Sequence, residues 1–351
     1  MRHFLTCLLA SLGLASACGQ QNFENADVEG FSSLIDEPGV VVLDVRTPKE
    51  YAEGHITGAL NIDQGEDDFL EKAKAALNRD KTVAVYCRSG RRSSSAAERL
   101  AAEGYRCVNL KGGIVAWRDA QKPVTTSTYE VDVFKTKSGK TVKFHALVHA
   151  SIRMEYDGKE IEIDPVTKLG NRTIDYSAFP KADYIFVTHE HGDHFDKEAI
   201  KALTADKTVL VTNKRCGDML GYGQVMGNGD ETKISDDITV VAVPAYNTTE
   251  GHLQFHPKGR DNGYIITVDG LRIYVAGDTE DIPEMNSIKD IDVAFLPCNQ
   301  PFTMTTDQLV GAARMVKPKV LFPYHYGQTD VSGIAAQLKD DGIEVRIRHY
   351  E

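Results

Sequence analysis

Residues 184–194 read YIFVTHEHGDH, and this stretch decides the fold of the second half of the chain. Its first four residues form a short apolar run, which predicts a buried strand. Three histidines and an aspartate follow within the next seven residues, at the carboxyl end of that strand. Imidazoles and carboxylates at this density are typical ligands of zinc and related divalent ions. His189 and His191 can face one ion, whereas Asp193 and His194 can face a second ion a few ångströms away.

This motif resembles the signature of the metallo-β-lactamase superfamily. The resemblance implies an αββα sandwich, and we assign it to residues 129–351, where strand signals dominate and helical segments are few. Strands are expected at 142–148, 152–156, 160–164, 184–187, 209–212, 238–245, 263–268, 271–275, 293–296 and 320–324. Helices are expected at 197–203, 305–317 and 332–340.

The same resemblance implies that further metal ligands follow later strands. Asp278 comes just after the strand at 271–275, and by resemblance it lies between the two metal ions. His325 follows the strand at 320–324 and resembles the last ligand of the second metal. Asp164 and His149 are interpreted as supporting or structural residues.

The third histidine of the first metal is less clear from the sequence. Relatives in the lactonase and phospholipase D-like branch carry Pro-Ala-x-His, whereas this chain has Asn247 at the position of the histidine. The loop that follows offers His252 and His256. We favour His256, because the motif His-Pro-Lys-Gly at 256–259 recurs in that branch, and keep His252 or Asn247 as alternatives.

The first half of the chain has a different pattern. Strands at 40–45 and 82–86 alternate with helices at 67–77 and 94–102, which predicts a parallel sheet covered by helices over residues 23–120. Cys87 stands directly after the second strand, just before a helix begins. Backbone N–H groups and the positive end of the helix dipole at such a position stabilise a thiolate or an anionic persulfide, and attract an oxyanion such as thiosulfate.

This region resembles the rhodanese family. The resemblance rests on Asp-Val-Arg at 44–46, on residues 50–62 (EYAEGHITGALNI) and on Gly-Gly-Ile-Val-Ala-Trp at 112–117. It implies that Cys87 carries sulfane sulfur, taken from a donor such as thiosulfate or a persulfide. It also implies an active-site loop whose length favours sulfur over phosphate, made of Arg88, Ser89, Gly90, Arg91, Arg92 and Ser93.

The net charge limits the kinds of partner, and the first residues of the chain indicate where the protein is located. A net charge of −11 argues against nucleic acid as a partner. Residues 1–18 resemble a bacterial lipoprotein signal in which Cys18 is acylated, although a plain signal peptide cleaved near Ala17 is the alternative. We therefore expect an exported protein, periplasmic or membrane-anchored, that meets the membrane through its lipid only. Residues 121–128 are interpreted as a linker.

The two resemblances together predict a metal-dependent hydrolase of a small-molecule substrate, fused to a persulfide-forming sulfurtransferase domain. Two divalent ions, zinc for preference, are expected, and Asp193 is expected to orient the nucleophile. Persulfide dioxygenases also pair these domains, but they use one iron held by two histidines and one carboxylate, so they are the first alternative. The second alternative is a sulfur-carrying or sensing protein with an inactive metal domain.

Overall fold

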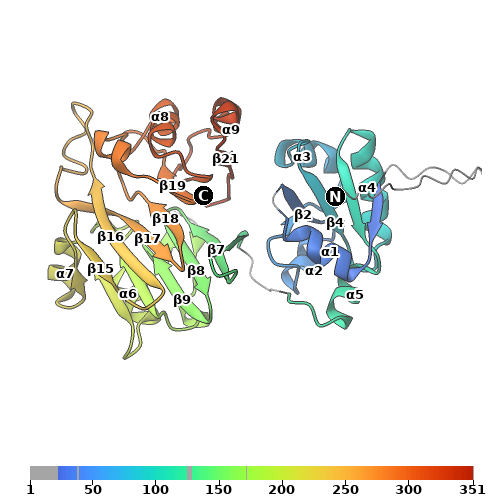
Figure 1. Ribbon diagram of the computed structural model, residues 1–351, viewed down its shortest axis with the longest axis horizontal. Helices are drawn as coiled ribbons and strands as arrows, with labels where there is room; N and C mark the ends of the chain where they lie inside the picture. The colour runs from blue at the N-terminus through green and yellow to red at the C-terminus, as the bar shows by residue number, and fades with distance from the viewer. Residues whose placement is uncertain (1–22, 38, 125–128, 171, 351) are drawn as a thin grey trace, which may run out of the picture. The chain divides into compact units, whose positions relative to one another are not determined.

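The chain forms two compact units, Met1–Thr126 and Ser127–Glu351. The structure is a computed structural model, and it describes residues 23–37, 39–124, 129–170 and 172–350 (Figure 1). The expected signal segment 1–18, with lipidation at Cys18, lies outside the described residues, as does the second half of the expected linker, and both stay predictions. In the part of the chain that the structure describes, no helix is long and apolar enough to cross a membrane.

A five-stranded parallel sheet in the order β1-β5-β4-β2-β3 forms the centre of the first unit. One hydrophobic cluster packs α3 and α4 against the sheet, and a second cluster packs α1 and α5. The predicted α/β architecture is therefore confirmed. The elements are β1 (Glu24–Ala26), α1 (Val28–Ile35), β2 (Val40–Asp44), α2 (Pro48–Ala52), β3 (Leu60–Asn61), α3 (Phe69–Ala76), β4 (Thr82–Tyr86), α4 (Arg91–Ala102), β5 (Arg106–Leu110) and α5 (Gly113–Asp119).

The helix after Cys87 begins three residues earlier than the sequence predicts. Gly90 has φ 87°, a left-handed conformation that favours glycine, and it caps α4 directly after the short loop. Arg91, Arg92 and Ser93 consequently lie in the first turn of the helix rather than in the loop.

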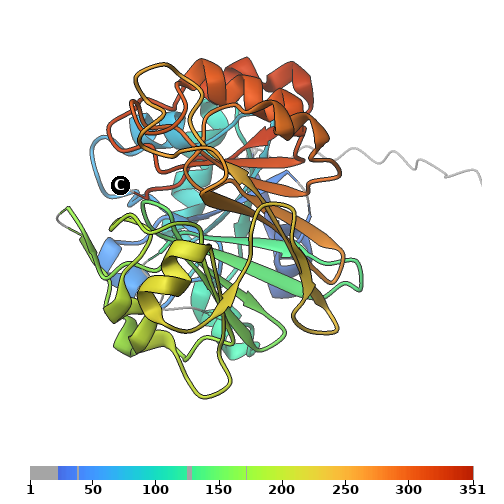
Figure 2. The ribbon, with the colours of Figure 1, turned by 90° about the vertical axis from the view of Figure 1, so that its left-hand side faces the viewer.

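Two seven-stranded sheets packed face to face make up the second unit, in the orders β14-β13-β12-β9-β8-β7-β6 and β15-β16-β17-β18-β19-β20-β21. The largest hydrophobic cluster lies between them, and smaller clusters lie under α6 on one side and under α8 and α9 on the other. In Figure 2 the yellow helices lie below the sheets and the orange to red helices lie above them. The predicted αββα sandwich is thereby confirmed.

The first sheet of this unit and its helices are β6 (Val131–Lys135), β7 (Thr141–Val148), β8 (Ser151–Tyr156), β9 (Lys159–Ile163), η1 (Tyr176–Ala178), β12 (Tyr184–Val187), α6 (Lys197–Leu203), β13 (Val209–Thr212), α7 (Lys214–Leu220) and β14 (Gln224–Val225). A small hairpin joins β10 (Lys168–Leu169) to β11 (Arg172–Thr173). The second half contains β15 (Glu231–Lys233), β16 (Ile238–Ala245), β17 (Asp261–Val268), β18 (Leu271–Val275), η2 (Pro283–Ser287), β19 (Val293–Pro297), α8 (Thr306–Val316), β20 (Val320–Tyr324), α9 (Ile334–Gln337), η3 (Lys339–Asp341) and β21 (Glu344–Val345).

Strand direction explains why the polar residues gather at one edge of each sheet. β12 is buried at every position and runs parallel to β9 and β13. In the other sheet β18, β19 and β20 are parallel neighbours. Because the carboxyl ends of parallel strands meet at the same edge, the segments that follow these strands come together there.

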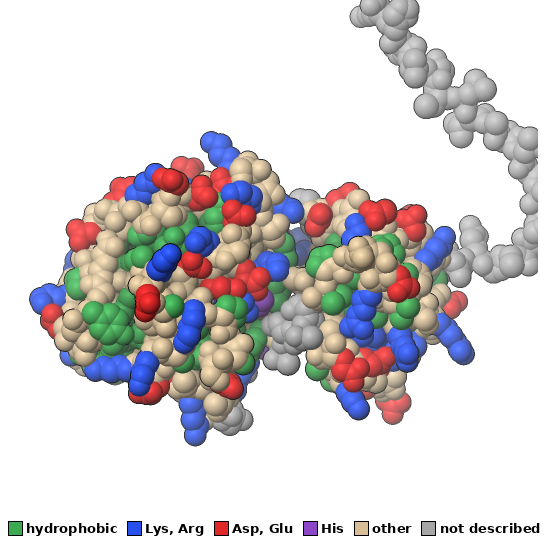
Figure 3. All heavy atoms as spheres, turned by 90° about the horizontal axis from the view of Figure 1, so that it is seen from below, with side chains coloured by type: hydrophobic (Ala, Val, Ile, Leu, Met, Phe, Trp, Pro, Cys, Tyr) green, Lys and Arg blue, Asp and Glu red, His purple; other side chains and the backbone are tan. Residues whose placement is uncertain are grey.

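Charges of both signs are mixed on the surface. Lys and Arg side chains lie beside Asp and Glu side chains on the face of the second unit shown in Figure 3.

Replacing Phe186 with alanine tests the core between the two sheets. This side chain is fully buried, and its ring centroid lies 5.7 Å from that of Tyr264 in the opposite sheet. Truncation should lower the free energy of unfolding by about 3–5 kcal/mol through lost burial and a cavity. Urea unfolding, followed by circular dichroism, measures this change in the free energy of unfolding. Tyr222→Ala, at a side chain 49% exposed, is the control and should change the free energy of unfolding by less than about 0.5 kcal/mol. Equal effects of the two variants would contradict the packing of Phe186 between the sheets.

Candidate metal centre

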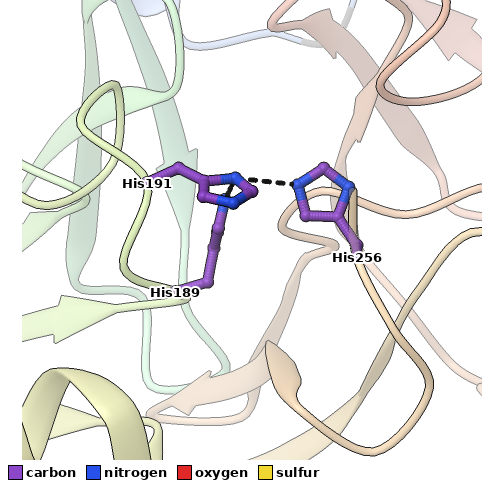
Figure 4. A group of neighbouring side chains, drawn as sticks. All are labelled: His189, His191 and His256. Carbon is purple, nitrogen blue, oxygen red and sulfur yellow. Dashed lines mark hydrogen bonds between the residues drawn. The ribbon is translucent and has the colours of Figure 1, made fainter. Parts of the chain in front are cut away.

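Three histidines converge at the carboxyl end of β12. The Nε2 atoms of His189 and His256 both lie 3.1 Å from Nδ1 of His191 (Figure 4). His189 and His256 are buried, whereas His191 is partly exposed and marks an open side of the group. Three imidazole nitrogens directed at one point form a ligand set typical of zinc.

A second group contains carboxylates as well as histidines. Nε2 of His325 lies 3.4 Å from Oδ2 of Asp193 and 3.2 Å from Oδ2 of Asp278. Nε2 of His194 lies 3.2 Å from Oδ1 of Asp278. The side chain of Asp193 is 31% exposed, so it is the open edge of this second group.

Asp278 lies between the two groups. Its Oδ2 is 3.3 Å from Nε2 of His256 and 3.8 Å from Nε2 of His189, on the side of the three-histidine group. Gly277 allows this approach, because it has φ 65° and a Cβ there would stand 2.7 Å from the carbonyl oxygen of Asn262. One carboxylate therefore faces both groups, which is the position implied for a bridging ligand.

A test of fit comes from the polar atoms that these residues leave without partners. Among the described residues, Nε2 of His194, Nε2 of His325 and Oδ1 of Asp278 are buried and make no hydrogen bond. Buried polar atoms are otherwise almost always paired, since an unpaired one costs about 1–3 kcal/mol. A divalent cation satisfies all three, so the donor set fits a metal.

The two groups differ in their electrostatics. Burial lowers the pKa of His256 to about 4 and that of His189 well below its usual value, so these imidazoles are neutral. Burial also disfavours a charged His194, but the carboxylates of Asp278, Asp193 and Asp164 outweigh it and raise the pKa of His194 well above its usual value. The second group therefore attracts positive charge more strongly than the first.

Buried neighbours fix the orientation of His194. Its Nδ1 lies 2.8 Å from Oδ2 of Asp164, which also accepts a hydrogen bond of 2.7 Å from Thr188 Oγ1. The carboxylate thus directs Nε2 of His194 toward Asp278. This is the supporting role expected of Asp164.

Asn247 plays the corresponding part for His256. Its Oδ1 lies 2.7 Å from Nδ1 of His256, which leaves Nε2 of that ring to face His191. The Asn247 amide in turn donates to the carbonyl of Phe302 (2.8 Å) and to the buried carboxylate of Glu280 (3.2 Å). The amide oxygen is therefore engaged with the ring, and Asn247 is a positioning residue rather than a ligand in this geometry.

The structure does not bring every candidate into the centre. His252 lies outside the metal-binding groups found among the described residues, with Nδ1 3.5 Å from Glu280 and its side chain 24% exposed. His256 lies at the position expected for the third histidine of the first metal. Its loop folds back so that the Asn247 N–H donates to the His256 carbonyl.

His149, which the sequence suggests is a supporting or structural residue, lies in a group with Asp193 and His325 that could hold an ion. Its Nε2 lies 3.3 Å from Oδ2 of Asp193, and its ring centroid is 3.7 Å from that of His325. It occupies a two-residue turn between β7 and β8, with φ 54°. Asp164 and His325 also have positive φ, of 45° and 48°. Such strained backbone clusters at functional sites, but it cannot be read from the sequence.

Cys87 in the first unit lies where the sequence places it, at the end of β4. It is buried, and Ser93 Oγ donates to its Sγ at 3.3 Å. Arg92, however, forms a two-pronged ion pair with Glu50 (2.6 and 2.7 Å), and its hydrogen bonds lower the pKa of Glu50 to about 2. Its charge is thus shared with a carboxylate, and its place in the anion loop stays a prediction. Gly90 is buried, whereas the remaining loop residues are exposed: Arg88, Ser89 and Arg91.

A two-sheet αββα sandwich with histidines and aspartates converging at strand ends defines a metallo-β-lactamase-like protein. Residues 143–325 match the model of the "Beta-lactamase superfamily domain", and residues 27–120 match that of the "Rhodanese-like domain". The chain belongs to the beta-lactamase superfamily, and its first unit is a rhodanese-like domain.

Relatives of the second unit include archaeal and bacterial proteins. A UPF0173 metal-dependent hydrolase of Pyrococcus furiosus is 34% identical over 195 residues, covering 53% of this chain and 84% of that protein. A crystal structure from Parabacteroides distasonis, described provisionally as a metal-dependent hydrolase, is 51% identical with a TM-score of 0.62, covering 64% of this chain and all of that one. Igni18, a metallo hydrolase of Ignicoccus hospitalis, is 26% identical with a TM-score of 0.51, covering 59% and 94%.

Changing Asn247 to alanine tests its positioning role. Without the amide oxygen, the His256 ring loses the partner of its Nδ1, and zinc affinity should fall about 10–100-fold. Competition with a chromophoric chelator measures this affinity. The control is Asn286→Ala, at an exposed asparagine that bonds to the Pro283 carbonyl. Unchanged affinity in Asn247→Ala would contradict the role assigned to this side chain.

Proposed function

We propose that the second unit is a binuclear zinc hydrolase of small molecules. The observation that supports it most is the convergence of eight imidazole and carboxylate side chains, His149 among them, around buried polar atoms that lack partners. The first ion would be held by His189, His191 and His256, and the second by Asp193, His194 and His325, with Asp278 shared. Ions of this kind supply Lewis acidity and lower the pKa of water.

Asp193 is the side chain suited to handle the attacking water. Burial would raise the pKa of its carboxyl, but the neighbouring imidazoles of His194, His149 and His325 hold the pKa far below its usual range. The carboxylate is therefore ionised and accepts hydrogen bonds at physiological pH. Its partial exposure leaves it within reach of a water that enters with the substrate.

Hydrolysis fits the ligand groups better than persulfide oxidation does. A mononuclear iron oxygenase needs two histidines and one carboxylate and leaves other positions open. Here a complete three-histidine group stands beside a second group with carboxylates. Relatives named as metal-dependent hydrolases support the same choice.

We further propose that the rhodanese-like domain carries sulfur on Cys87. The Cys87 thiolate would attack the sulfane sulfur of thiosulfate, forming a sulfur–sulfur bond to the cysteine and releasing sulfite as the old sulfur–sulfur bond breaks. Ser93 Oγ donates to Sγ, and exposed Arg88 and Arg91 supply positive charge for the donor anion.

The proposed location is outside the cytosol. It rests on residues 1–18 alone, whose apolar run ends in Ala-Ser-Ala before Cys18.

The two activities should be separable by single substitutions. Asp193→Ala should lower kcat for hydrolysis of a lactone or ester at least about 100-fold, as expected when the group that positions the attacking water is lost, while leaving sulfite release from thiosulfate unchanged. Cys87→Ser should abolish sulfite release and leave hydrolysis intact. Each variant serves as the folded control for the other, and both reactions are followed spectrophotometrically. Loss of both activities in either folded variant would contradict two independent sites.

A further inference from the structure

The loop after β19 lies against both halves of the candidate metal centre. β18, β19 and β20 are parallel neighbours, and Pro297 at the end of β19 is level with Tyr324, the residue before His325. Residues 298–304 therefore begin at the sheet edge between Asp278 and His325. On one side the Phe302 carbonyl accepts from Asn247, which holds His256. On the other side a Cβ at Gly327 would stand 3.3 Å from the Asn299 amide.

Exposed apolar side chains belong to the two loops that flank this edge of the centre. The side chains of Phe302 and Leu253 are 42% and 51% exposed. The ring of Phe255, the residue before His256, has its centroid 5.0 Å from that of Phe302. We call Phe255 and Phe302, together with the exposed Leu253 of the same loop as Phe255, the apolar rim. Exposed apolar side chains beside a polar site are typical of ligand-binding surfaces.

The two cations that follow His256 in its loop are paired with carboxylates. Arg260 binds Asp261 (2.8 Å) and lies 3.6 Å from Glu190. Lys258 binds Glu284 at 2.9 Å. These guanidinium and ammonium groups are compensated by carboxylates, so neither adds net positive charge for an anionic substrate group.

We propose that the apolar rim binds an uncharged, apolar group of the substrate next to the scissile bond. The preferred substrates are then neutral esters, lactones or amides with an aliphatic or aromatic substituent, rather than phosphodiesters. This inference rests on the proposed hydrolase function, because the rim can bind part of a substrate only if the metal centre beside it acts on that substrate.

Binding of alkyl hydroxamates to the zinc-loaded full chain tests the proposal without relying on turnover. The hydroxamate head binds the metal, and the alkyl chain reports on its surroundings. Lengthening acetohydroxamate to hexanohydroxamate adds four methylenes and should tighten binding at least about tenfold if the rim covers them. A probe of the same length that ends in a carboxylate should lose most of this gain. Isothermal titration calorimetry gives each Kd.

Phe302→Ala should remove most of the chain-length gain while leaving acetohydroxamate binding unchanged, since its backbone carbonyl still holds Asn247. Tyr222→Ala is the matched control. This exposed tyrosine lies between α7 and β14 and so belongs to neither of the loops that form the apolar rim. Equal affinity for both chain lengths, tighter binding of the carboxylate probe, or no effect of Phe302→Ala would overturn the apolar rim but leave the hydrolase proposal standing. Failure to bind zinc or acetohydroxamate would overturn both.

Discussion

The carboxylate of Asp278 is the feature on which the second unit depends. It is buried at the carboxyl end of β18, with imidazoles of both ligand groups within 3.8 Å. An isolated carboxylate in such a place is costly, because burial removes its hydration. Its oxygens face buried imidazoles, and Oδ1 is left without a hydrogen bond. A bound cation would offset this cost, and the neighbouring buried imidazoles and carboxylates are the residues that could hold one.

The scaffold supplies rigidity by placing these side chains where strands end. Two sheets with a shared apolar core bring the edge beyond β12 opposite the edge beyond β18 and β20. A further layer of buried polar residues then orients the ligands, with Asp164 behind His194 and Asn247 behind His256. Because each orienting residue is itself hydrogen-bonded, the ligand rings have little freedom to turn away.

Local patterns predict much of this fold, and pairings between distant residues account for what they miss. The strands at 184–187, 209–212, 238–245, 271–275 and 320–324 follow from short apolar runs and agree with the structure. The helix α7 was missed; Asn213, whose side chain accepts from the Cys216 N–H, is its clearest start signal. The motif at 256–259 favoured His256 from the sequence, but the hydrogen bond that orients its ring, to Asn247 nine residues away, is seen only in the structure. The pairing of Arg92 with Glu50 spans 42 residues, and no local pattern reveals it.

Anomalous diffraction from crystals of the full chain, recorded at the zinc and iron absorption edges, tests the central claim most directly. We expect two zinc peaks per chain. One should lie among His189, His191 and His256, the other should lie among Asp193, His194 and His325, and Asp278 should touch both. A single iron peak held by two histidines and one carboxylate would contradict the binuclear hydrolase and favour persulfide oxidation.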